Sequence, residues 1–218
     1  MAALPIATWP LLGRVRDANG VARLLHLLAV RNGELLNTSG LSRELGLDRT
    51  TVREYIAVLE RLFLVRRLLP WHRNVGKRLV RTPKMHVVDS GLAATLAGLA
   101  PGDWIAKRDR MGHLLESFVA HQLVALAGWT DPDIRFWHFR DKDGQEVDLV
   151  MTLGNRTWGM EVKATSTPGR SAGRGMARLA ALCGNDFEGG ILFYNGRDIL
   201  PLAGQDALAV PVSELWTR

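Results

Sequence analysis

Apolar residues in the first hundred positions recur at three- and four-residue intervals, the spacing of helices that bury one face. This pattern predicts a leucine-rich helix, a short second helix and a longer third helix, over 21–31, 41–45 and 49–62. Gly46 separates the last two, and Asp48 supplies a hydrogen-bonding cap to the third. A short helix, a turn containing glycine and a capped longer helix are together typical of a helix-turn-helix.

Two apolar segments follow the third predicted helix, and each has the length of a strand. We expect 63–69 and 84–88 to pair with each other. Such a pair would form the wing of a winged helix-turn-helix. The sequence therefore predicts a winged helix-turn-helix domain over residues 1–99, with a long basic loop in its wing.

In the second half of the chain, segments in which apolar and polar residues alternate, as in strands, occur together with two helical segments. A connection over 100–110 precedes it, and the expected order is helix, three strands, helix and strand. These elements are expected at 111–127, 134–139, 145–151, 157–163, 176–182 and 190–194. Such an order predicts an α/β fold whose second domain, residues 100–218, contains a mixed sheet.

Composition and charge restrict the classes of partner. The 218-residue chain is 47% hydrophobic and 23% charged, with a formal net charge of +6 and a pI near 10.1. A basic chain favours acidic partners, and nucleic acid is the usual one. Cys183 is the single cysteine, which leaves no disulfide framework within the chain. No apolar run approaches the length of a membrane span, so we expect a cytoplasmic protein without a membrane partner.

Basic residues are concentrated between Arg61 and Val88, where no acidic residue occurs. Trp71 and His72 lie among them, and basic side chains next to an aromatic ring suit phosphate binding. The alternative is a solvated loop, and winged helices also serve as protein-binding modules. Together with the amino end of the third helix, the expected DNA-contacting residues are Arg49, Thr50, Arg53, Arg66, Arg67, Arg73, Lys77, Arg78 and Arg81.

Acidic residues on the two central strands of the second half indicate a metal site. Side chains two positions apart share a strand face, so Glu161 and Lys163 point the same way. If the strands form a hairpin, Asp148 and Glu161 converge, and their oxygens suit Mg²⁺ or Mn²⁺. Lys163 would then orient or deprotonate an attacking water. Glu116, on the preceding helix, would add a third carboxylate.

Each of these residues also has an ordinary structural interpretation. Glu161 and Lys163 could form a surface ion pair, and Glu116 could simply face solvent. Glu146 is either a further member of the site or a partner of Arg140 across the turn. The helical histidines His113 and His121 are more often structural than ligating. The joint occurrence of four residues in the order expected of a metal site favours a functional role for these four only: Glu116, Asp148, Glu161 and Lys163.

The arrangement of Glu116, Asp148 and the Glu161-Val162-Lys163 segment resembles the PD-(D/E)xK superfamily of restriction-endonuclease-like phosphodiesterases. The more specific resemblance is to DUF4143, the carboxyl-terminal region of many prokaryotic AAA-type ATPases, and it runs from about Asp17 to the chain end. The segments that carry it are 35–37, 63–65, 70–74, 76–80, 89–93, 115–119, 144–148 and 161–164. The proline that names the superfamily motif is absent before Asp148, where Val147 stands.

The resemblance implies a restriction-endonuclease-like second domain with Glu116, Asp148, Glu161 and Lys163 as catalytic residues, the three acids also binding Mg²⁺ or Mn²⁺. It implies a hydrolase acting on DNA. In the family an ATPase domain usually precedes this region. This chain has no Walker A motif, so no nucleotide site is expected in it. An ATPase domain encoded elsewhere, or a second copy of the chain, is an expected partner. The alternative is a non-catalytic DNA- or protein-binding module that regulates a partner ATPase.

Overall fold

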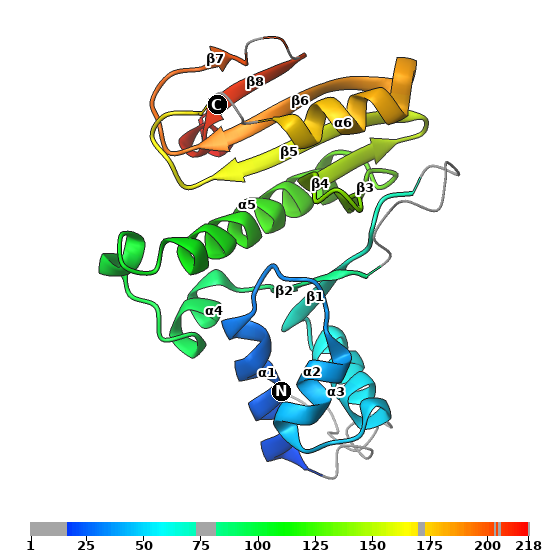
Figure 1. Ribbon diagram of the computed structural model, residues 1–218, viewed down its shortest axis with the longest axis vertical. Coiled ribbons are helices and arrows are strands. Elements are labelled where there is room, and N and C mark those ends of the chain that lie inside the picture. Colours follow the sequence, from blue (N-terminus) through cyan, green and yellow to red (C-terminus); the bar gives the residue numbers. More distant parts are fainter. Residues whose placement is uncertain (1–16, 73–81, 170–172, 203, 205, 218) are drawn as a thin grey trace, which may run out of the picture.

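A group of helices is followed by a mixed sheet in the computed structural model, which describes residues 17–72, 82–169, 173–202, 204 and 206–217 (Figure 1). The amino-terminal part, up to residue 99, holds four helices and two strands among its described residues. They are α1 (Ala18–Val30), α2 (Thr38–Leu45), α3 (Arg49–Arg61), β1 (Val65–Leu68), β2 (Lys84–Val87) and α4 (Ser90–Leu96).

Local capping explains where α2 and α3 begin. The side chain of Asn37 accepts a hydrogen bond from the Gly40 amide at 2.8 Å. Asp48 likewise accepts from the amides of residues 50 and 51 at 2.8 and 2.9 Å, as the sequence predicts. Gly46 ends α2 at φ +68°, a left-handed conformation that glycine adopts without steric cost. The helices then bury their apolar faces around Leu24 and Ile56, both 0% exposed.

Strand β2 has backbone partners on both of its edges. It pairs antiparallel with β1, with Val65 opposite Val87, which confirms the expected strand pair. On its other edge it bridges the loop between α1 and α2, where Leu35 lies opposite Lys84. Beyond β1 the chain reaches the second sheet, where the Trp71 amide donates a hydrogen bond to the His138 carbonyl at 2.7 Å. The backbone of β2 is therefore held at the junction of the two parts.

The carboxyl-terminal part contains a six-stranded mixed sheet in the order β3-β4-β5-β6-β8-β7. Strands β3, β4 and β5 are antiparallel neighbours, β5, β6 and β8 are parallel, and β7 is antiparallel to β8. Its elements are η3 (Pro101–Trp104), α5 (Arg108–Thr130), β3 (Arg135–Arg140), β4 (Glu146–Leu153), β5 (Arg156–Lys163), α6 (Arg174–Cys183), η4 (Gly184–Asp186), β6 (Phe187–Tyr194), β7 (Leu200–Pro201), β8 (Ala207–Pro211) and η5 (Val212–Leu215).

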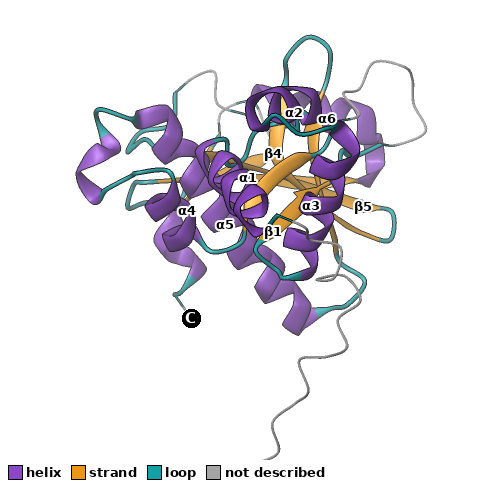
Figure 2. Ribbon diagram, turned by 90° about the horizontal axis from the view of Figure 1, so that it is seen from below, coloured by secondary structure: helices purple, strands orange, loops and turns teal. Residues whose placement is uncertain are grey.

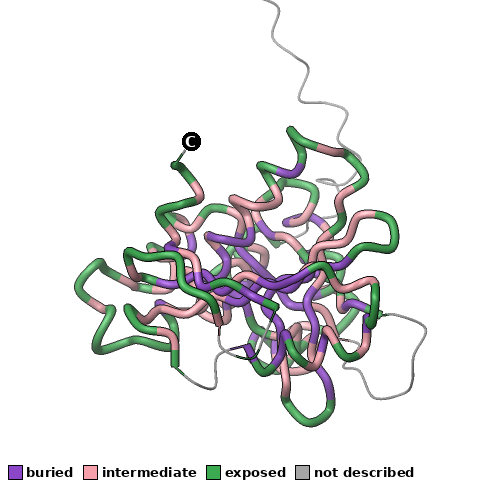
Figure 3. Tube along the Cα trace, turned by 90° about the horizontal axis from the view of Figure 1, so that it is seen from above, coloured by how far each residue is buried: buried purple, intermediate pink, exposed green. Residues whose placement is uncertain are grey.

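Helices α5 and α6 pack against different sets of apolar side chains from this sheet. Val119 of α5 clusters with Leu149 and Met160, while Leu179 of α6 clusters with Val150 and residues of β6 and β8. Because neighbouring strand residues point to opposite faces, the sheet lies between the two helices. Figure 2 shows the strands in the middle of the molecule with helices around much of them, and Figure 3 shows the buried residues gathered in its interior.

Several elements differ from the sequence expectation. Helix α4 and strands β7 and β8 were not expected, and α5 begins at Arg108 rather than at 111. Strand β1 starts two residues late, because Phe63 has a positive φ of 56° that interrupts extended backbone. Trp71 is buried against Phe139, so it is not available to stack on a nucleic-acid base. In the described part of the chain no helix is long and apolar enough to span a membrane.

Candidate functional site

Three carboxylates predicted from the sequence are all buried where α5, β4 and β5 meet. Glu116, Asp148 and Glu161 are 6%, 5% and 5% exposed, and they are called the carboxylate cluster below. A buried carboxylate is rare unless it is paired or binds a metal. The interpretation of Glu116 as a solvated helix residue is therefore wrong, and Glu161 pairs with Lys163 at 3.6 Å from a buried position rather than at the surface.

Strand pairing brings two members of the cluster together. Strands β4 and β5 form the expected antiparallel hairpin, with Leu149 opposite Met160, so the next residues, Asp148 and Glu161, also lie side by side. A hydrogen bond fixes the first of these, since one carboxylate oxygen of Asp148 (Oδ2) accepts from the Val162 amide at 2.9 Å.

A lysine from β2 completes the cluster, and sequence reasoning missed it. The ammonium of Lys84 (Nζ) lies 2.7 Å from Glu116 Oε1 and 3.6 Å from Asp148 Oδ1, and the residue is 3% exposed. Burial alone would lower the pKa of Lys84, but the two carboxylates outweigh it and raise the pKa above its usual value. Lys84 lies within the basic run between Arg61 and Val88 but is not among the residues expected to contact DNA. Its position in a predicted strand next to Met85 and Val87 was the available signal.

Glu161 is the member of the cluster with an unsatisfied oxygen. Its Oε1 is buried and has no hydrogen-bond partner among the described residues. Burial raises its pKa, Lys163 opposes that rise from 3.6 Å, and Asp148 adds to it. Gly175, at the start of α6, packs so closely that a side-chain carbon there would lie 3.2 Å from this oxygen. The site is thus enclosed on the side of α6.

Neighbouring charged residues are arranged around the cluster. His113 Nδ1 lies 3.5 Å from Glu116 Oε2, and this contact raises the pKa of His113. Glu146 pairs with Arg140 across the turn at 3.2 Å, one of the two roles expected for it. His121 lies further along α5, where its ring packs edge-on against His86 rather than joining the carboxylates.

An open groove of about 560 Å³ gives access to part of this cluster. Glu116, Asp148 and Lys163 line it together with Glu146 and residues of the turn after β5, whereas Glu161 does not line it. Lys163 is far more accessible than the three acids, with its side chain 42% exposed against 6–8% for theirs. A phosphate group entering the groove would therefore meet Lys163 before it met the buried acids.

The donor chemistry fits a divalent metal held by two carboxylates. Asp148 and Glu161 are adjacent oxygen donors of the kind that Mg²⁺ and Mn²⁺ prefer; Oε1 of Glu161 has no hydrogen-bond partner among the described residues, and Lys163 lies 3.6 Å from Oε2. Glu116 differs from them because Lys84 already binds it. Within the ranges that the structure describes, no three His, Cys, Asp or Glu side chains form a ready metal cluster.

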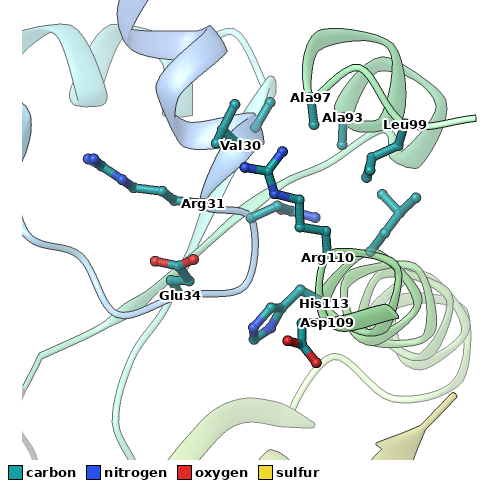
Figure 4. Close-up of a pocket in the computed structure, with 12 residues that line it drawn as sticks. Val30, Arg31, Glu34, Ala93, Ala97, Leu99, Asp109, Arg110 and His113 are labelled. Atoms are coloured by element: carbon teal, nitrogen blue, oxygen red, sulfur yellow. The ribbon is translucent and has the colours of Figure 1, made fainter. Parts of the chain in front are cut away.

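A second pocket of about 310 Å³ lies beside the groove, between the end of α1, α4 and the start of α5. It shares Asp109 and His113 with the groove. Figure 4 shows Arg110 and His113 projecting from α5 into this pocket. Asn32 also lines it, and the side-chain nitrogen of that residue is buried without a hydrogen-bond partner among the described residues.

The expected DNA-contacting residues fall into three groups. Arg49, Thr50 and Arg53 are exposed on the first turns of α3, as expected. Arg67 is exposed but pairs with Glu60, and Arg66 is half-buried. The remaining four lie outside the described residues, namely Arg73, Lys77, Arg78 and Arg81.

Comparison with known families divides the chain in the same place as the fold. Residues 111–215 match the model of DUF4143, a domain of unknown function. Residues 9–103 match a second model, DUF8612, also a domain of unknown function. The carboxylate cluster lies inside the DUF4143 match, as the sequence resemblance implies. Lys84 lies inside the DUF8612 match, so the two matched segments meet at the site.

Similar proteins occur in mycobacteria. The chain is 34% identical over 191 residues to the uncharacterized protein Mb2031c of Mycobacterium bovis and, equally, to the uncharacterized protein Rv2008c of Mycobacterium tuberculosis. The match covers 88% of this chain but only 41% of each relative. A solved structure of a mutant MepR from a multidrug-resistant S. aureus isolate covers 56% of this chain and 86% of its own, at 15% identity. Its TM-score of 0.28 is too low to assign a fold.

Proposed function

We propose that the chain binds DNA and that its carboxylate cluster is the metal site of a phosphodiesterase. The observation that carries the proposal is the placement of Asp148 beside Glu161, whose buried oxygen has no partner in the described structure. Lys163 stands next to them at the groove. This combination of two acids and a lysine on adjacent strands is what the resemblance to the PD-(D/E)xK nucleases implies.

Each residue has a role that follows from its surroundings. Asp148 and Glu161 would hold Mg²⁺ or Mn²⁺, which when bound would polarise the phosphodiester and stabilise its developing charge. Lys163 would bind a phosphate oxygen or orient the attacking water, because its side chain is 42% exposed at the groove. Glu116 is the ligand with least support, since Lys84 binds it at 2.7 Å.

DNA binding is assigned to the winged helix-turn-helix that α2, α3, β1 and β2 would form. Arg49, Thr50 and Arg53, which are exposed at the amino end of α3, would contact phosphates or base edges. Arg66 and Arg67 of β1 would extend that contact. The exposure of Arg49, Thr50 and Arg53 contrasts with the burial of the three acids, so DNA binding and phosphodiester cleavage would use different surfaces.

A cleavage assay with purified full chain tests the proposal. With Mn²⁺ or Mg²⁺ we expect cleavage of duplex, single-stranded or branched DNA, and we expect Asp148→Ala to abolish it. Glu188→Ala, which removes an exposed acid from β6, is the matched control and should cleave like wild type. DNA binding should persist in Asp148→Ala. If wild type cleaves none of these substrates with either metal, the phosphodiesterase assignment is wrong.

The alternative function is a non-catalytic module that binds DNA or regulates a partner ATPase. The observation that favours it is Lys84, which already neutralises part of the carboxylate cluster. It predicts DNA binding that is independent of metal and unchanged by Asp148→Ala, without cleavage. Loss of all salt-sensitive DNA binding would leave a protein partner.

A further inference from the structure

Lys84 reaches the carboxylate cluster from a separate part of the chain. It lies on β2, whereas the other charged groups of the site lie on α5, β4 and β5. The backbone of β2 is paired on both edges, with β1 and with the loop at Leu35. The strand therefore presents the lysine from a fixed position, and only its side chain is free to change place.

The contacts of Lys84 occupy oxygens that a metal would otherwise use. Glu116 Oε1 accepts from the Lys84 ammonium at 2.7 Å, and Glu116 Oε2 faces His113 at 3.5 Å. Asp148 Oδ1 faces Lys84 at 3.6 Å, and Asp148 Oδ2 accepts from the Val162 amide. Both oxygens of these two acids are thus already matched with a donor or a cation.

We propose that Lys84 is the resident cation of this site and competes with a divalent metal for Glu116 and Asp148. The inference rests on the metal site of the proposed function and adds to it a means of setting metal affinity. Magnesium needs oxygens at about 2.0–2.1 Å, so it cannot take an oxygen that an ammonium is donating to from the same side. A monovalent cation this close also repels a divalent one, more strongly in a buried site than in water.

Two consequences follow for the intact protein. Metal affinity is lower than three carboxylates alone would give, because the Lys84 charge offsets part of theirs. Metal binding by Glu116 or Asp148 also requires the Lys84 side chain to withdraw.

Titration of Mn²⁺ alone into the full chain tests the competition. We expect Lys84→Met, which keeps the length and removes the charge, to bind Mn²⁺ at least about tenfold more tightly than wild type. Lys107→Met is the matched control, since this lysine pairs with Asp103 outside the site, and its Mn²⁺ affinity should stay at the wild-type value. Adding Asp148→Asn to Lys84→Met should remove the gain. A folded Lys84→Met with unchanged or weaker affinity overturns the proposal.

A measurement on wild type covers the case in which Lys84→Met does not fold. Amine labelling followed by peptide mass spectrometry should find Lys84 protected without metal and labelled faster with saturating Mn²⁺. Equal protection in both conditions overturns the proposal. Neither readout depends on DNA cleavage. Tighter Mn²⁺ binding by Lys84→Met, without DNA cleavage by wild type, would support the role of Lys84 and reject the phosphodiesterase. Cleavage by wild type, without tighter Mn²⁺ binding by Lys84→Met, would support the phosphodiesterase and reject the role of Lys84.

Discussion

Two ion pairs of nearly equal length occupy opposite environments in this protein. Arg67 and Glu60 meet at 2.9 Å on the surface, with side chains 36% and 29% exposed. Lys84 and Glu116 meet at 2.7 Å in the interior, with side chains 4% and 8% exposed. Water and salt screen the first pair and not the second. Removing one partner should therefore cost little stability at the Arg67–Glu60 pair and much more at the Lys84–Glu116 pair.

Removing the acid from each pair should give the largest difference in the free energy of unfolding between the buried and the exposed environment. We expect Glu116→Ala to lower the free energy of unfolding by about 3–5 kcal/mol, because it leaves the buried Lys84 with a single, more distant partner. Glu60→Ala, the matched control, should cost at most about 1 kcal/mol. Urea denaturation followed by circular dichroism measures both.

A double substitution sharpens the same contrast. Lys84→Met combined with Glu116→Leu removes both buried charges, and we expect it to recover much of the stability lost in Glu116→Ala. Equal losses in Glu116→Ala and Glu60→Ala would mean that burial does not distinguish the two pairs.

Local sequence signals predicted most of the fold. Asp48 and Gly46 mark the ends of their helices by their own chemistry, so α2 and α3 could be placed from the sequence. Alternating residues similarly placed β4 and β5 and hence the pairing of Asp148 with Glu161. Helix α4 and the late strands β7 and β8 were missed. Strand β7 has only two residues, too few to carry a periodic signal.

Lys84 and Trp71 mark the limit of sequence reasoning at the site. Both lie in or beside the basic run, where composition favours exposure and phosphate contact. Their burial depends on partners that are distant in the chain, namely Glu116 and Asp148 for Lys84 and Phe139 for Trp71. A local pattern contains no information on those partners. Strand alternation and the family resemblance both indicated the acids, whereas the lysine was missed because it lies outside those strands and outside the family motif.

Buried histidines near the same junction should make stability depend on pH. Burial lowers the pKa of His121 and of His138 to about 4, and that of His86 well below its usual value. The unfolded chain binds these protons below about pH 6.5, whereas the folded chain does not. Stability should therefore fall as the pH drops from about 6.5 towards 4, by about 1.4 kcal/mol per pH unit for each histidine.

Urea denaturation across this pH range measures the slope. His121→Gln should reduce it by about one proton, while the exposed His72→Gln should leave it unchanged. His113 has a raised pKa, so its contribution is present below about pH 6.5 and is lost above it, outside the acid window. A slope that His121→Gln does not alter would contradict the lowered pKa of this half-buried histidine.

Exposed arginines should show the smallest effects, and only in binding. Arg53→Ala removes a solvent-facing charge from α3, so we expect its unfolding free energy to stay within about 0.5 kcal/mol of wild type. If Arg53 contacts a phosphate, the slope of log affinity for DNA against log salt should fall by about 0.9. Fluorescence anisotropy with a labelled duplex at several salt concentrations measures it. Arg156→Ala, at the start of β5, removes an equally exposed charge away from α3 and should keep the wild-type slope. Equal slopes for wild type, Arg53→Ala and Arg156→Ala would mean that Arg53 does not contact DNA. The contrast between exposed and buried charges would then rest on the stability measurements alone.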